Sequence, residues 1–95
     1  MDKIEYLLIK LGEEACEISL ATSKALTFGL DDNYTEVSPA VRIAQEFNDF
    51  IAVIEMLEEE GVDFRYLYSD KQITAKKNKV KKFFRYSLKR GILEE

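Results

Sequence analysis

The sequence predicts an all-α protein, an antiparallel helical bundle with three main helices per chain that is completed by oligomerisation. Apolar residues recur at helical spacing over three long stretches, a capping residue precedes each stretch, and a glycine follows each one. The 95 residues are expected to form one domain, residues 1–95. A domain of this size buries only a modest core unless a partner enlarges it.

The first helix is expected to begin near Asp2, whose side chain can cap the backbone while Glu5 lies three residues on. Gly29 is expected to end this helix. The single cysteine, Cys16, lies among its apolar residues and is expected to be a small buried hydrophobe rather than a reactive thiol. The apolar positions of this stretch are Ile4, Leu7, Leu8, Leu11, Ala15, Ile18, Ala21, Ala25 and Leu26.

A loop is expected over residues 30–37, because the Asp31-Asp32-Asn33 run favours turns. Ser38 then supplies a capping side chain, and Pro39 suits the first helical position. The second helix is expected to continue to about Glu60 and to end at Gly61.

The centre of the second helix is apolar on every side. Five consecutive apolar residues, Phe50 to Ile54, leave no face for solvent, and Val53 and Met56 are expected to be buried. We therefore expect this helix to be buried all round. One chain of three helices could hardly cover it, which predicts a homodimer or homotetramer.

The third helix follows a short aromatic connector over residues 62–68. Ser69 and Gln72 have the spacing of a capping box, and the helix is expected from about Asp70 to Arg90, with Gly91 after it. Its buried side is expected to carry Ile73, Val80, Phe84 and Leu88.

Charge and composition exclude several kinds of protein. Residues 1–70 hold 5 basic and 16 acidic side chains, whereas residues 71–95 hold 9 and 2. The absence of histidine removes the commonest general base and zinc ligand. The longest apolar run, Phe50–Ile54, is far too short to span a bilayer, and the charged N-terminal stretch does not fit a signal peptide. We expect a cytoplasmic protein that is not bound to a membrane.

Two pairs of carboxylates interrupt the apolar stripes of the first two helices. Glu14 lies on the core stripe of the first helix, and Glu17 follows at a spacing that separates the side chains by about 5 to 6 Å. Glu46 and Asp49 repeat this spacing in the second helix. Four buried carboxylates without a cationic partner would carry a severe desolvation cost, which a divalent cation would remove. Oxygen ligands of this kind suit Mg²⁺ or Mn²⁺ and favour phosphate ester or anhydride chemistry.

A surface role for these residues is the alternative. Acidic residues at helical spacing are usually solvated, and Glu13, Glu55 and residues 58–60 are expected to be. The pattern alone leaves a metal site and a solvated surface about equally open.

The two acidic pairs also carry a resemblance. Glu14-Ala15-Cys16-Glu17, followed after 28 residues by Glu46-Phe47-Asn48-Asp49, resembles the EXXE and EXXD motifs of the MazG-like, all-alpha nucleoside triphosphate (NTP) pyrophosphatases. The stretch from Lys24 to Asp32 is similar to the end of that family's first helix. The lysine-rich helix with Ala75-Lys76 and Tyr86-Ser87 is similar to the C-terminal helix of short phage and bacterial members.

The resemblance implies Mg²⁺-dependent hydrolysis of an NTP, with a deoxynucleoside triphosphate expected, to the monophosphate and pyrophosphate. It also implies antiparallel helices assembled as a dimer or tetramer. Glu14, Glu17, Glu46 and Asp49 would be the metal ligands, with Glu17 and Glu46 as catalytic residues and Glu17 preferred for activating the attacking water. Phe47 and Asn48 stand where leucine and glycine are common in the family, which leaves the nucleotide preference open.

Basic and aromatic residues outside the motifs are candidates for substrate binding. Lys24, ten residues after Glu14, could reach phosphates at the rim of the site, although surface placement is equally expected. Phe28 and Tyr34 could stack on a base, although aromatic residues of small domains more often belong to the core. On the third helix the candidates for contacting the triphosphate are Lys76, Lys79, Lys82 and Tyr86, with a solvated face as the alternative.

Two functions of other classes compete with NTP hydrolysis. The basic helix over residues 71–90 could bind nucleic acid, with an affinity that falls steeply with salt. We do not favour the hypothesis of nucleic-acid binding, because this helix holds only two arginines, Arg85 and Arg90, and the rest of the chain is acidic. A structural helical adaptor, whose acidic residues have no chemical role, is the other alternative.

Overall fold

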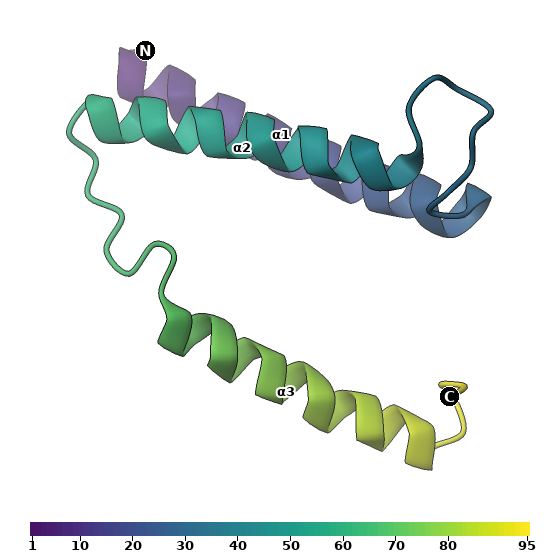
Figure 1. The fold of residues 1–95 in the computed structure, drawn as a ribbon. Coiled ribbons are helices and arrows are strands. Elements are labelled where there is room, and N and C mark those ends of the chain that lie inside the picture. Colours follow the sequence, from purple (N-terminus) through teal and green to yellow (C-terminus); the bar gives the residue numbers. More distant parts are fainter. The chain divides into compact units, whose positions relative to one another are not determined.

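Three α-helices make up the regular structure of the protein, described by a computed structural model that covers residues 1–95. In chain order they are α1 (Lys3–Phe28), α2 (Pro39–Glu59) and α3 (Asp70–Lys89), and there is no β-strand (Figure 1). The expected all-α class with three helices is confirmed, and its completion into a bundle by other copies stays a prediction. None of the three helices combines the length and apolarity that a membrane crossing requires.

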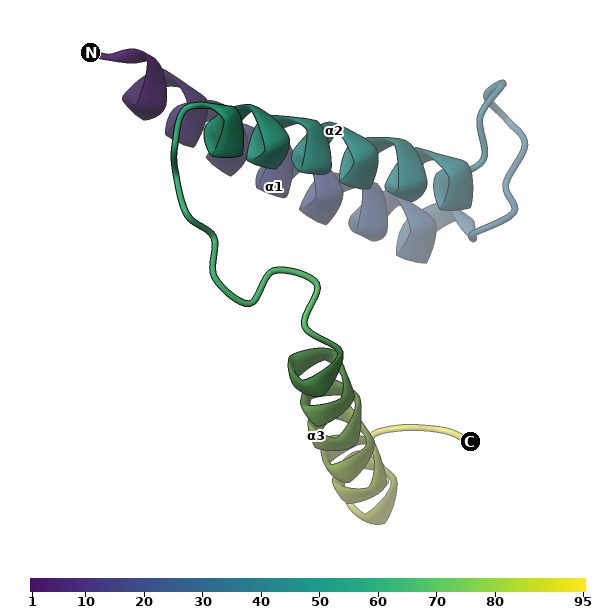
Figure 2. The same cartoon turned by 60° about the vertical axis from the view of Figure 1, so that its left-hand side comes forward.

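The chain divides into two compact units, Met1–Asp63 and Phe64–Glu95, and each is described by itself. The first unit is a hairpin in which α1 and α2 run side by side and antiparallel, as both views show (Figures 1 and 2). The second unit contains α3. Because compactness alone does not define a domain, the expectation of one domain stays a prediction.

The helix starts are the expected ones because a side chain caps each of them. The Asp2 carboxylate accepts a hydrogen bond from the backbone N–H of Glu5 at 2.8 Å. The Ser38 and Ser69 hydroxyls accept bonds in the same way from the N–H groups three residues on, at 3.3 and 3.2 Å. Pro39 occupies the first position of α2, where no intrahelical N–H bond is lost.

The expected glycine stops are also present. Gly29, Gly61 and Gly91 have φ values of 94°, 92° and 76°, a backbone region that a side chain makes unfavourable. Gly29 donates its N–H to the Ala25 carbonyl at 2.9 Å and so ends the bonding of α1. The following loop is joined to α2 by a bond from the Ala40 N–H to the Leu30 carbonyl at 3.1 Å.

The core of the hairpin is one narrow stripe between its two helices. The expected burial of Cys16 is wrong, since this residue is exposed. Within one chain α2 is not buried all round, because Met56 remains 43% exposed and Val53 is only half-buried. The expectation that other copies of the chain bury the rest of this helix stays a prediction. Each helix of a two-helix hairpin has a single neighbour, so only the side chains that face that neighbour are shielded from solvent. The buried residues are Leu7, Ala21, Ala25, Ile54 and Leu57.

No residue of α3 is buried within its own unit, and the expected burial of one side by another part of the chain or by a second copy stays a prediction. Ile73, Val80 and Phe84 are exposed, and Leu88 is half-buried. The unit that contains α3 has no other helix, and nothing within it covers this apolar face.

Candidate metal centre and neighbouring pockets

A single antiparallel register brings the acidic motifs of α1 and α2 together. At the open end of the hairpin, Lys3 Nζ lies 2.7 Å from Glu60 Oε1 in an ion pair. The same register places Glu14 near Asp49 on the facing helix. The hairpin therefore aligns the two sequence motifs as well as packing its core.

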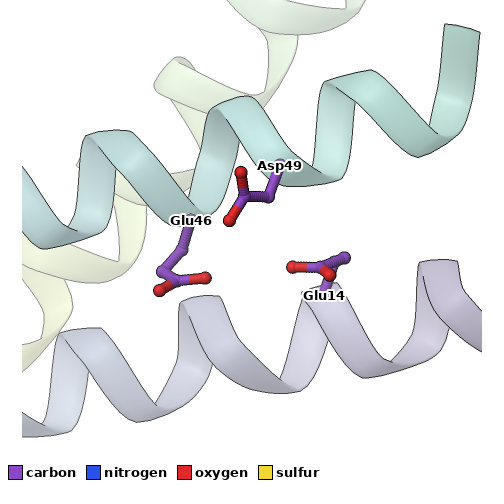
Figure 3. Close-up of side chains that lie close together, drawn as sticks. All are labelled: Glu14, Glu46 and Asp49. Carbon is purple, nitrogen blue, oxygen red and sulfur yellow. The ribbon is translucent and has the colours of Figure 1, made fainter.

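Three carboxylates meet in the groove between the helices, and we call them the carboxylate cluster. Glu14 of α1 and Glu46 and Asp49 of α2 each offer one oxygen, and these oxygens all lie within 4.8 Å of one another. Figure 3 shows the three side chains directed toward one another across the groove. Oxygens bound to one octahedral Mg²⁺ are about 3.0 Å apart when adjacent and about 4.2 Å apart when opposite, so the three side chains would have to move closer together to contact one ion.

The pKa of the Glu14 carboxyl reflects its position in this groove. Partial burial raises the pKa of the Glu14 carboxyl above its ordinary value, and the negative charges of Asp49 and Glu46 raise it further. No lysine or arginine forms a salt bridge with the cluster. No positive side chain of the protein therefore offsets the repulsion among the three carboxylates, and a bound cation would offset it.

The predicted burial of the four carboxylates is wrong, because the groove between two helices stays open to solvent. Glu14 and Glu46 are half-buried, whereas Glu17 and Asp49 are exposed. Glu17 lies outside the carboxylate cluster. Its predicted roles as a metal ligand and catalytic residue stay predictions.

Glu17 is nevertheless beside the cluster. It lines a small pocket of about 180 Å³, which we call the inner pocket, together with Glu46 of the cluster. Two cationic residues, Lys24 of α1 and Arg42 of α2, line the same pocket. Positive side chains are therefore placed next to two of the acidic residues.

A larger pocket of about 540 Å³, the loop-end pocket, lies where the 29–38 loop joins α1 to α2. Lys24 and Arg42 line this pocket as well, so the two pockets share their cationic wall. The predicted position of Lys24 near the site is consistent with this arrangement, and its role in binding stays a prediction. The other lining residues include Phe28, Asp32, Tyr34 and Thr35.

Arg42 was not among the site residues expected from the sequence. A usable signal was present, because Arg42 lies four residues before Glu46 and such residues share one face of a helix. Lys24 has a similar relation to Glu17, seven residues earlier on α1. Both helices thus carry a carboxylate and a cation along the same line.

The candidate binding residues of α3 belong to the second unit. Lys76 and Lys79 line a shallow groove of about 310 Å³ on α3 with Val80, Phe83 and Phe84. Lys82 Nζ lies 5.9 Å from the centre of the Phe83 ring. The predicted contact of Lys76, Lys79, Lys82 and Tyr86 with substrate stays a prediction.

Comparisons of the chain with models of known protein families, with curated proteins and with solved structures found no match. Acidic groups at a protein surface often lie together without binding an ion. The features that bear on function are therefore the donor chemistry of the carboxylate cluster and the cations and pockets beside it.

Proposed function

We propose that the protein is a Mg²⁺-dependent nucleoside triphosphate pyrophosphohydrolase that resembles the MazG-like family. The observation that carries the proposal is the convergence of Glu14, Glu46 and Asp49 from two helices to within 4.8 Å. Their oxygens are hard donors, which suit Mg²⁺ or Mn²⁺, and the chain has no histidine to favour zinc.

The surroundings of the carboxylate cluster support a polyphosphate substrate. A divalent ion bound to three carboxylates retains affinity for further oxygen ligands, and substrate phosphates commonly supply them. Lys24 and Arg42 stand in the adjoining inner pocket, where they can hold negative oxygens. When bound, Mg²⁺ would neutralise charge that develops on the phosphates during reaction.

In the proposed reaction a water oxygen forms a bond to the α-phosphorus, and the bond from that phosphorus to the oxygen bridging to the β-phosphorus breaks. Pyrophosphate leaves with the bridging oxygen, and the monophosphate keeps the water oxygen. Glu17, exposed in the inner pocket, accepts the proton of the water, with Glu46 as the alternative base. Lys24 and Arg42 hold the phosphates in place.

A second copy of the chain completes the proposed enzyme. The hairpin exposes several large apolar side chains that a partner would cover, which favours a homodimer or homotetramer. Light scattering coupled to gel filtration measures this directly. A mass equal to one chain over the concentration range used for assays would contradict the oligomer. The exposed apolar residues are Leu8, Ile9, Leu20, Val41, Phe47 and Met56.

A cytoplasmic location belongs to the same proposal, since nucleotide pools are found there.

The test is a product analysis in water enriched in ¹⁸O. The purified protein is incubated with a panel of ribo- and deoxyribonucleoside triphosphates, with Mg²⁺ or with a chelator, and the products are resolved by ³¹P NMR. We expect equal amounts of monophosphate and pyrophosphate only with Mg²⁺, and we expect the ¹⁸O on the monophosphate. Diphosphate with inorganic phosphate, or no turnover of any nucleotide, would exclude the proposed reaction.

A further inference from the structure

We infer that the loop-end pocket binds the nucleobase of the substrate and that Asp32 makes it select guanine. This inference rests on the proposed function and adds the substrate class to it. The pocket belongs entirely to the first unit, where α1, the 29–38 loop and α2 form its walls.

The position of the pocket fits one end of a nucleotide. Its volume of about 540 Å³ lies within the range of about 300 to 1,000 Å³ that small-molecule sites occupy. It shares Ala21, Lys24 and Arg42 with the inner pocket, which also contains Glu17 and Glu46. A triphosphate held beside the carboxylates therefore has its nucleoside directed toward the loop-end pocket.

The shared cationic wall separates the two ends of such a ligand. Lys24 and Arg42 form no salt bridge, although the inner pocket also contains carboxylates. Their donors remain available for phosphate oxygens. This arrangement leaves the part of the loop-end pocket beyond them for the sugar and the base.

Two aromatic side chains line that part of the pocket. Phe28 is 64% exposed and Tyr34 is 92% exposed, so neither contributes to the core of the hairpin. Exposed aromatic rings at the wall of a pocket provide faces on which a base can stack, and such stacking tolerates every base. Stacking therefore contributes affinity for any base, and selection of one base over another requires a polar residue.

Asp32 is the one acidic residue that lines the loop-end pocket. Its side chain is half-buried and forms neither a salt bridge nor a hydrogen bond. The backbone holds it in place, because the Asp32 N–H donates to the Gly29 carbonyl at 3.3 Å. An ionised carboxylate only accepts hydrogen bonds, so it selects bases that present donors.

Guanine fits a carboxylate best among the common bases. Its ring N1–H and its 2-amino group point the same way and can each donate to one carboxylate oxygen, which makes the contact bidentate. Adenine and cytosine present one amino group, and thymine and uracil present a single ring N–H beside two carbonyl oxygens that would face the negative charge. We therefore expect guanine first, adenine and cytosine next, and thymine and uracil last.

The test measures base preference without catalysis. The chain has no tryptophan, so Tyr34→Trp introduces a single tryptophan in the pocket, which can be excited selectively over the remaining tyrosines. dGMP, dAMP, dCMP and dTMP are titrated in the presence of a chelator, and calorimetry on the wild-type chain repeats the dGMP and dTMP titrations independently of the reporter. We expect dGMP to bind about tenfold more tightly than dTMP, the effect of one additional hydrogen bond to a charged acceptor.

Asp32→Asn and Asp31→Asn are the matched pair of variants. Asp31 precedes Asp32 in the same loop but does not line the pocket. Asp32→Asn is expected to bring dGMP and dTMP to within about threefold of each other, while Asp31→Asn keeps the preference. Equal binding of all four nucleotides by the wild type, or an unchanged preference in Asp32→Asn, would overturn the inference.

The outcome separates this inference from the proposed function. Mg²⁺-dependent hydrolysis with a base preference that Asp32→Asn does not change would leave the enzyme proposal intact and reject the role of Asp32. Selective binding of dGMP together with no hydrolysis of dGTP would support the pocket and reject the enzyme.

Discussion

Lys24 of α1 and Arg42 of α2 face the same space from opposite helices, and both line the inner pocket as well as the loop-end pocket. On one side of them are Glu17 and Glu46, and on the other are the residues of the loop. This pair of cations links the carboxylates of the inner pocket to the loop-end pocket. The proposed substrate therefore lies along the groove, with its phosphates at these two residues.

Removing either cation should weaken substrate binding more than it slows the chemistry. Lys24→Met and Arg42→Met are each expected to raise KM for the preferred triphosphate about tenfold, because a charged hydrogen bond to phosphate is lost. Steady-state kinetics measures this effect. Lys82→Met on α3 is the comparison, and a rise in KM that is larger for this variant than for the hairpin variants would favour the α3 contact instead.

Glu46 should be indispensable for turnover. Glu46→Gln keeps the shape of the side chain but removes a negative ligand, and we expect kcat to fall at least about 100-fold. Glu55→Gln is the matched control, because Glu55 is exposed on the same helix and lies outside the carboxylate cluster and both pockets. Circular dichroism checks that both variants keep their helices. Normal hydrolysis by Glu46→Gln would show that the site is wrong.

The raised pKa of Glu14 predicts how stability depends on pH. The folded chain binds the Glu14 proton more tightly than the unfolded chain does, so the ionised carboxylate destabilises the fold at neutral pH. This penalty disappears as the pH falls through the raised pKa and below the ordinary value of 4.5. Without divalent ions, Glu14→Gln should raise the Tm at pH 7 and have little effect below pH 4.5.

Divalent ions should narrow the difference in Tm between these two proteins. Mg²⁺ stabilises the folded state to which it binds, so it should raise the Tm of the wild type more than that of Glu14→Gln. Thermal melts with Mg²⁺ and with a chelator, each at two pH values, test both expectations. A variant that is less stable than the wild type in chelator at pH 7 would contradict the electrostatic argument.

The sequence predicts features that depend on neighbouring residues better than features that depend on contacts between distant segments. The caps at Asp2, Ser38 and Ser69 are local, since each bonds to a backbone group three residues on, and the sequence predicts them correctly. The meeting of Glu14 with Glu46 and Asp49 could be inferred because helical spacing puts each on an apolar stripe.

Burial could not be predicted in the same way. An apolar stripe indicates which side of a helix favours a partner, but it does not show that a partner is present. Met56 and Cys16 are therefore exposed here, although their positions resemble those of core residues. The loop-end pocket depends on how the 29–38 loop closes against the helices, which helical periodicity does not encode. This is why the position of Asp32 in a pocket could not be predicted, whereas the spacing between Arg42 and Glu46 did offer a signal in the sequence.

The core of the hairpin makes a separate prediction about stability. Leu57 is fully buried, and Leu57→Ala should lower the free energy of unfolding by about 2 to 5 kcal/mol through lost burial and a residual cavity. Leu26 is 91% exposed, and Leu26→Ala should change it by about 0.5 kcal/mol. Urea denaturation at one protein concentration gives both values. Equal losses in the two variants would contradict the assignment of Leu57 to the core and of Leu26 to the solvent-exposed surface.

Binding of nucleic acid is the alternative that α3 supports, since all the lysines and arginines of this helix are exposed. We expect only weak, strongly salt-dependent association with duplex DNA, with Kd no lower than about 10⁻⁶ M near physiological salt. Fluorescence anisotropy at two salt concentrations measures it. Nanomolar binding that persists at the higher salt concentration, in a protein without NTP turnover, would favour the nucleic-acid function.

A titration of Mn²⁺ followed by electron paramagnetic resonance tests most directly whether Glu14, Glu46 and Asp49 share a cation. The free ion gives a strong signal that is lost on binding, so the wild type and Glu55→Gln should both remove signal stoichiometrically, while Glu46→Gln and Asp49→Asn should not. If the signal of free Mn²⁺ stays unchanged with the wild type, or falls equally with all four proteins, the three carboxylates do not form a metal site.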